Sequence, residues 1–170
     1  MGIRLALVIG TVALFWVNAS TAQTKTEAPA PPPAAAPQVF TEFAPDDLAS
    51  IIRDGGYRAE LIHESDHYRI RTGMGGYTCN AYLYCNTGGK CTSLDWGLNF
   101  NPASMYTLTL ANRFNREYRY AKAYLAANGT FTLEYSVDFA GGVTREAILQ
   151  SAQRFENVAS GLDSWVKKSQ

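Results

Sequence analysis

The stretch "YRYAKAYLAANGTFTLEYSVDF", from Tyr118 to Phe139, decides the fold because two independent signals in it predict a β-hairpin. Asn128-Gly129 is the residue pair preferred in two-residue type I′ turns, and alternating residues flank it on both sides. Such a turn predicts these cross-strand pairs: Ala126 with Phe131, Tyr124 with Leu133, and Tyr120 with Val137. All of these side chains fall on one face, so the turn and the apolar pattern agree on an antiparallel hairpin.

Two more hairpins are predicted upstream. The first joins residues 57–63 to residues 67–73 around Glu64-Ser65-Asp66, and the second joins residues 76–85 to residues 91–100 around "NTGGK". In the last of these strands, large apolar residues alternate with small or polar ones, which is typical of a strand with one buried face. Its core-facing side chains are Leu94, Trp96, Leu98 and Phe100.

Three helices are predicted from their capping residues. They cover residues 44–57 with Pro45 in the first turn, residues 101–117 starting at Asn101-Pro102, and residues 145–166 with Thr144 as cap. The order is helix, four strands, helix, two strands, helix, with short connections. This order predicts an α+β fold: an antiparallel sheet of about six strands with the helices packed on it.

The N-terminal part of the chain is typical of an exported protein. Residues 1–22 predict a signal peptide, since Arg4 precedes an uncharged apolar run and small residues precede a cut before Gln23. Residues 23–38 are rich in Pro and Ala and predict a disordered linker, which leaves residues 39–170 for the folded domain. No cysteine follows the apolar run, so we expect a periplasmic or secreted protein without a stable membrane anchor after cleavage.

The charge balance argues against a nucleic-acid partner. Removal of residues 1–22 removes Arg4 and no acidic residue, which leaves 14 Lys and Arg residues against 15 Asp and Glu residues. Proteins that bind nucleic acid usually carry a basic excess or a basic run, and neither is present. No motif of a hydrolase, a metalloprotease or a phosphate-binding loop stands out either, and we expect neither enzymatic activity nor a cofactor.

The cysteines are Cys79, Cys85 and Cys91. A three-residue loop at Thr87-Gly88-Gly89 sets Cys85 opposite Cys91 and Cys79 opposite Gly97, whereas a two-residue Gly88-Gly89 loop sets Cys85 against Thr92. Opposed cysteines lie within disulfide range, and an exported chain favours oxidation, so we predict a Cys85–Cys91 disulfide. Zinc is disfavoured because Cys79 and Cys85 are about 20 Å apart on one extended strand.

Cys79 is left without a partner within the chain. It is predicted either as a small buried residue or as an exposed thiol that pairs between chains. A separate polar cluster, His63, Asp66 and His67, flanks the first hairpin turn. Its imidazoles could meet across the strands and bind a divalent metal, although a solvated polar turn explains the same residues.

Two further groups of residues bear on binding. Met105, Leu108 and Ala111 lie along one side of the middle predicted helix and form a candidate interaction surface. Several tyrosines fall on predicted core-facing positions: Tyr82, Tyr84, Tyr120, Tyr124 and Tyr135. Core packing is the favoured interpretation of these tyrosines, and an aromatic surface for a peptide is the alternative.

Four stretches carry a resemblance to a known family: "LASIIRDGGYRAEL" (48–61), "CNTGGKCTSLDW" (85–96), "ANRFNREYRYAKAYLAANG" (111–129) and "DFAGGVTRE" (138–146). Over about residues 46–165 the chain resembles the YbjN family, described as bacterial sensory transduction regulators. None of the stretches is a catalytic signature. The resemblance implies a fold similar to that of type III secretion chaperones, and it allows a homodimer through the middle helix.

These observations lead to three hypotheses of function. The first is an exported, non-enzymatic domain with a regulatory or chaperone-like role that binds a protein or peptide. The alternative with most support from individual residues is a periplasmic metal-binding protein that uses His63 and His67. The third is a hydrolase whose active site the sequence does not reveal.

Overall fold

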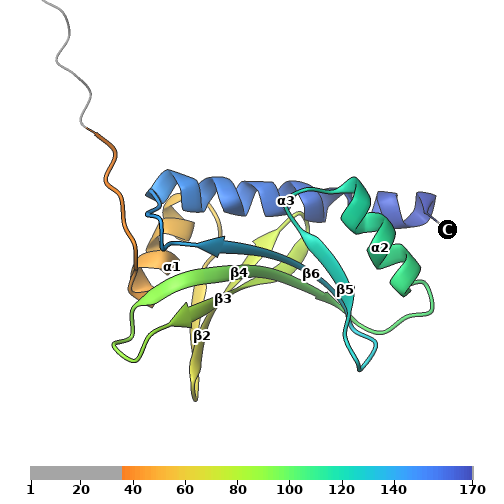
Figure 1. The fold of residues 1–170 in the computed structure, drawn as a ribbon, viewed down its shortest axis with the longest axis horizontal. Helices are drawn as coiled ribbons and strands as arrows, with labels where there is room; N and C mark the ends of the chain where they lie inside the picture. Colours follow the sequence, from red (N-terminus) through yellow and green to blue (C-terminus); the bar gives the residue numbers. More distant parts are fainter. Residues whose placement is uncertain (1–35, 170) are drawn as a thin grey trace, which may run out of the picture. The chain divides into compact units, whose positions relative to one another are not determined.

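The computed structural model describes residues 36–169 and confirms the predicted α+β architecture (Figure 1). Six strands form one antiparallel sheet in the order β1-β2-β3-β4-β6-β5. The elements are α1 (Pro45–Asp54), β1 (Glu60–Glu64), β2 (His67–Met74), β3 (Tyr77–Cys85), β4 (Cys91–Phe100), α2 (Leu108–Glu117), β5 (Lys122–Leu125), β6 (Phe131–Asp138) and α3 (Arg145–Lys168). The predicted signal peptide and most of the predicted linker lie outside the described residues. No helix within residues 36–169 is long and apolar enough to cross a bilayer.

The core lies between the sheet and the helices, which cover one face. Figure 1 shows α3 running along this face, with α1 and α2 toward its two ends. Trp96 of β4 is fully buried, and its Nε1 donates a hydrogen bond to Ser151 Oγ on α3 at 2.8 Å. Ser151 Oγ in turn donates to the Ile148 carbonyl at 2.6 Å, so the Trp96 and Ser151 side chains both have partners inside this layer.

The ends of the helices follow their capping residues, with one correction. Pro45 lies at the start of α1, and Thr144 caps α3 by accepting a hydrogen bond from Ala147 N at 3.1 Å, as predicted. The predicted start of the middle helix at Asn101-Pro102 is wrong, because α2 begins at Leu108 after its cap Thr107. The preceding segment is held on the sheet, where the ring of Tyr106 stacks on Phe131 with centroids 4.9 Å apart.

The hairpin between β3 and β4 is closed as predicted, but its register then shifts by one residue. Cys85 pairs with Cys91, whereas Cys79 is not opposite Gly97, because a β-bulge next to Cys85 moves the remaining pairs along the strand. The bulge places Leu83 opposite Leu94, both of which are buried. Core packing therefore explains why the strands do not keep the register that the turn alone predicts.

The β5–β6 hairpin turns through three residues, Ala127–Gly129, and the predicted two-residue turn is wrong. Ala126 N donates to Thr130 O at 2.8 Å, and Leu125 rather than Ala126 pairs with Phe131. A shift of one residue exchanges the two faces of a strand. The buried face of β5 thus carries alanine and leucine instead of the predicted tyrosines.

Three of the tyrosines predicted to face the core are exposed instead: Tyr84 (53%), Tyr120 (47%) and Tyr124 (40%). Helix α2 packs against β5 and buries Leu110, Ala111 and Phe114 in the core. The small side chains of Ala121 and Ala123 are buried and allow the helix to approach the strand. Packing of α2 therefore decides which side of β5 faces inward.

Candidate functional site

The start of α2 presents apolar side chains to solvent. Thr107 Oγ1 accepts a hydrogen bond from Leu110 N at 3.1 Å and begins the helix, which leaves Leu108 on its outer side. Leu108 is 66% exposed and Met105 is 40% exposed. A hollow of about 380 Å³ lies beside Met105 but not Leu108, lined by Ser104, Met105, Thr107, Thr109, Leu110, Arg113 and Ser169. We call Met105, Leu108 and this hollow the α2 patch.

Ala111, the third residue of the predicted interaction surface, lies in the core. It shares the inner side of α2 with Leu110 and Phe114, which are buried with it. The structure therefore keeps Met105 and Leu108 exposed and removes Ala111 from the candidate surface.

The α2 patch rests on a rigid support. The ring of Phe114 stacks on Tyr118 with centroids 4.4 Å apart and meets Trp165 of α3 edge-on at 5.5 Å. Trp165 Nε1 also donates to a carboxylate oxygen of Glu117, and this hydrogen bond lowers the pKa of Glu117. Arg113 forms an ion pair with the same carboxylate at 2.9 Å. These contacts fix α2 against α3, so a partner would meet a preorganised surface.

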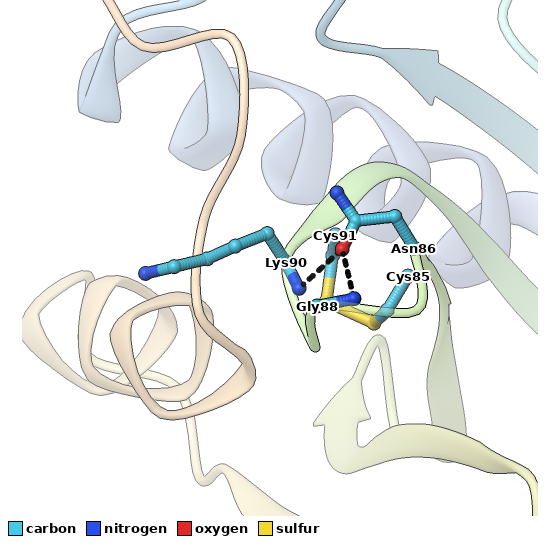
Figure 2. Close-up of a disulfide and its surroundings, with 5 residues drawn as sticks. All are labelled: Cys85, Asn86, Gly88, Lys90 and Cys91. Atoms are coloured by element: carbon cyan, nitrogen blue, oxygen red, sulfur yellow. Dashed lines mark hydrogen bonds between the residues drawn. A yellow bond between two sulfur atoms is a disulfide. The ribbon is translucent and has the colours of Figure 1, made fainter.

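The predicted disulfide between Cys85 and Cys91 is present and closes the β3–β4 hairpin (Figure 2). Figure 2 also shows the Asn86 side chain turned back over the loop, where its Oδ1 accepts hydrogen bonds from Gly88 N and Lys90 N, both at 3.0 Å. The loop is thus held by a covalent bond and by one amide side chain.

The backbone of Cys91 also pairs with the segment that precedes α1. Phe43 N donates to Cys91 O at 3.0 Å, and Cys91 N donates to Phe43 O at 2.8 Å. The ring of Phe43 meets Phe139 edge-on at 5.2 Å, next to the end of β6. The backbone of Cys91 therefore holds the N-terminal segment against the hairpin that the disulfide closes.

Cys79 is fully buried, which agrees with its interpretation as a small core residue. Burial raises the pKa of its thiol to about 12. A neutral, inaccessible thiol does not form disulfides between chains, so the alternative of an exposed pairing cysteine is wrong.

The residues of the predicted metal cluster do not converge. Cross-strand pairing sets His63 opposite Tyr68 and Glu64 opposite His67, which places the two histidines on opposite faces of the β1–β2 hairpin. The His63 ring stacks on Tyr68 at 4.2 Å, whereas His67 lies 2.7 Å from carboxylate oxygens of Asp66 and Glu64. Within residues 36–169 no group of three His, Cys, Asp or Glu residues could hold a metal ion. The metal-binding alternative thus has no support from the geometry.

The face of the sheet away from the helices carries tyrosine–carboxylate pairs that the sequence analysis missed. Tyr84 donates to Asp95 at 2.8 Å, and this hydrogen bond, with burial, raises the Tyr84 pKa to about 12. Tyr124 donates to Glu134 at 3.0 Å, and Glu134 also pairs with Lys122 at 2.8 Å. The available signal was that Tyr120, Lys122 and Tyr124 alternate with Ala121 and Ala123, but this alternation does not say which set of residues faces inward.

Comparison with known proteins identifies one family. The family model of YbjN, with the description "Putative bacterial sensory transduction regulator", matches residues 44–168. No curated protein matches the chain significantly. The match covers the domain from the start of α1 to the end of α3, including the α2 patch and the disulfide hairpin.

Proposed function

Because the chain belongs to the YbjN family, we propose that it is a non-enzymatic, chaperone-like regulatory domain that binds a protein partner outside the cytoplasm. The observation that carries the proposal is the exposed α2 patch. Leu108 projects into solvent from a helix whose inner side is locked against the core. Burying a leucine side chain contributes about 1.5–3 kcal/mol, which is enough to make it a main contact of an interface.

The hollow beside Met105 supports a polypeptide as the ligand. It combines apolar atoms of Met105 and Leu110 with polar side chains, such as Thr109 and Arg113, along its lining. An interface usually has an apolar centre and a polar rim, and the α2 patch offers both. A partner that inserts one apolar side chain into the hollow and covers Leu108 fits this surface.

Action outside the cytoplasm has two supports. Residues 1–22 have the composition of a signal peptide, and the Cys85–Cys91 disulfide fits an oxidising compartment. The Pro- and Ala-rich residues 23–38 would then hold the domain away from the N-terminus of the mature chain.

Site-specific photo-crosslinking in the native cell envelope tests this proposal. A photoreactive amino acid at Leu108 of the full chain should capture another protein, identified by mass spectrometry. The matched control places the same amino acid at Tyr84, which is also exposed but lies on the open face of the sheet. Capture at position 108 and not at 84 supports the proposal. Crosslinks only to a second copy of the chain would indicate a homodimer through α2 instead. The absence of any crosslink at position 108 would contradict the proposal.

A further inference from the structure

One edge of the sheet is only half covered. β6 has 8 residues and its neighbour β5 has 4, and their pairing ends at Lys122 opposite Glu134. Figure 1 shows β5 coming from α2 and running beside only the part of β6 nearest the turn. Residues 135–138 of β6 consequently have a strand on the β4 side and none on the other.

The direction of the backbone groups on β6 follows from its hydrogen bonds. Phe139 N donates to Thr92 O on the β4 side, whereas Thr130 O accepts from Ala126 N on the β5 side. Successive residues of an antiparallel strand direct their N–H and C=O groups to alternate sides. Ser136 and Asp138 therefore direct theirs to the uncovered side, and neither has a backbone partner there in the described part of the chain.

At the edge of β5, a side chain of α2 forms hydrogen bonds with outward backbone groups. The open half of β6 differs because its outward backbone groups have no such partner among the described residues. The Asn115 side chain on α2 accepts a hydrogen bond from Ala123 N at 2.7 Å and donates to Ala123 O at 2.9 Å. These bonds occupy the outward backbone groups of Ala123 within β5, as natural sheets usually arrange at an exposed edge. Ser136 and Asp138 are exposed and have no such cover.

A hollow of about 240 Å³ lies beside the open half of β6 and carries unpaired positive charge. Its lining comprises Arg119, Tyr120, Ala121, Lys122, Glu134, Tyr135 and Ser136, and the carboxylate of Glu134 is paired with Lys122. The Arg154 guanidinium lies 4.9 Å from the centroid of the Tyr120 ring. Neither Arg119 nor Arg154 forms an ion pair with any described residue. An acidic side chain would complement this end of the sheet.

We propose that the exposed backbone of Ser136 and Asp138 binds an extended segment of another protein as an added strand, with an acidic side chain of that segment beside Arg119 and Arg154. The proposal rests on the proposed protein-binding function and adds a second contact surface to the α2 patch. A second copy of this chain fits less well, since edge-to-edge pairing would bring the same arginines toward each other. The uncovered end of β2 at Gly73 is a less suitable site for an added strand, because the hollow beside it is only about 80 Å³.

Binding of a defined peptide to the full mature chain tests the proposal. The probe is a blocked heptapeptide of sequence TVTETVT, and its counterpart TVTKTVT differs only in charge. With the glutamate peptide, hydrogen exchange at the Ser136 and Asp138 amides should slow at least about tenfold, because both would become hydrogen-bonded. The lysine peptide should protect them less. Equal protection by both peptides, protection at Gly73 instead, or no protection would overturn the proposal.

Two variants separate backbone pairing from charge. Ser136→Pro removes an N–H that points away from β4, so it should abolish peptide binding and leave the sheet intact. The double variant Arg119→Glu/Arg154→Glu keeps every backbone group and should reverse the preference between the glutamate and lysine peptides. If Ser136→Pro does not fold, this double variant still tests whether the peptide binds beside the arginines. Unchanged preference would overturn the charge assignment. Lys168→Glu, which reverses an exposed charge at the end of α3, is the control and should bind the peptide normally. Capture at Leu108 with no peptide binding at β6 would overturn this inference alone.

Discussion

The β3–β4 and β5–β6 hairpins turn through loops of the same geometry. Three residues span each loop, Thr87–Gly89 in one and Ala127–Gly129 in the other. The third is a glycine with positive φ in both, 72° at Gly89 and 83° at Gly129, and its N–H donates at 2.9 Å to the carbonyl of the residue before the loop. A left-handed residue at this position is the usual form of a three-residue hairpin.

The two hairpins are held closed by different contacts. A disulfide and the paired segment at Phe43 hold the first, whereas packing of α2 and the Asn115 side chain hold the second. Similar turns thus accommodate either kind of closure. We expect the first hairpin to respond to redox conditions and the second to changes in the α2–β5 contact.

The largest expected effect is at the inner side of β5. Ala123 is buried under α2, so Ala123→Asp should destabilise the protein by at least about 3 kcal/mol through an unpaired buried charge. Tyr124→Ser, on the neighbouring outer position, should cost less than about 1 kcal/mol. Urea unfolding measures both. The reverse order would favour the two-residue register, in which Tyr124 faces the core.

Loss of the disulfide should have the next largest effect. The Cys85→Ser/Cys91→Ser variant should lose about 2 kcal/mol on the chain-entropy description of a small loop. Reductant should lower the urea midpoint of the natural protein and leave that of the double variant unchanged. A natural protein whose midpoint does not respond to reductant would show that the first hairpin needs no covalent closure.

Substitution of the turn glycines compares the loops directly. Gly89→Ala and Gly129→Ala each force a side chain into positive φ, at a cost of about 1–2 kcal/mol. Gly129→Ala should be the more harmful, because its Cβ would lie 3.2 Å from Pro102, whereas a Cβ at Gly89 meets nothing within 4 Å. Gly141→Ala has neither problem and serves as the control. Thermal unfolding gives the order, and equal effects of all three would contradict the shared geometry.

The smallest effect concerns the tyrosine–carboxylate pair on each hairpin. Tyr84 and Tyr124 both have a raised pKa, caused first by the Asp95 hydrogen bond at Tyr84 and by burial at Tyr124. A raised pKa means that the folded state holds the proton more tightly than the unfolded state does. The stabilisation that each tyrosine contributes is therefore fully present below its unfolded pKa of about 10. For Tyr84 it is lost as the pH rises toward about 12.

Ultraviolet titration of tyrosinate tests this pair. The pKa values of Tyr57 and Tyr77 are also raised to about 12, so Tyr84→Phe should reduce the tyrosinate component that ionises near pH 12 by one residue. The substitution should cost less than about 1 kcal/mol at neutral pH. Tyr120→Phe is the matched control, because the Tyr120 hydroxyl forms no hydrogen bond with any described residue. An unchanged amplitude of this high-pH component in Tyr84→Phe would show that Tyr84 does not contribute to it.

Features that depend on neighbouring residues could be predicted from sequence. Pro45 and Thr144 predict the starts of α1 and α3, and the "NTGGK" loop places Cys85 opposite Cys91. Of the candidate site, the exposed Met105 and Leu108 were on the predicted surface. These predictions succeed because capping, turn geometry and disulfide range are local properties of the chain.

Features that depend on packing could not be predicted. The Asn128-Gly129 pair suits loops of two or three residues. Before it, alanines alternate with larger residues, Tyr120, Lys122 and Tyr124, and this alternation does not say which set faces inward. The bulge beside Cys85 has the same origin, since it lets Leu83 meet Leu94 in the core. The sequence by itself thus determined the order of the elements, the antiparallel sheet and the disulfide. Only the tertiary structure decided the register of the last hairpin and which tyrosines lie on the surface, because α2 must lie close to β5 and only the alanine face admits it.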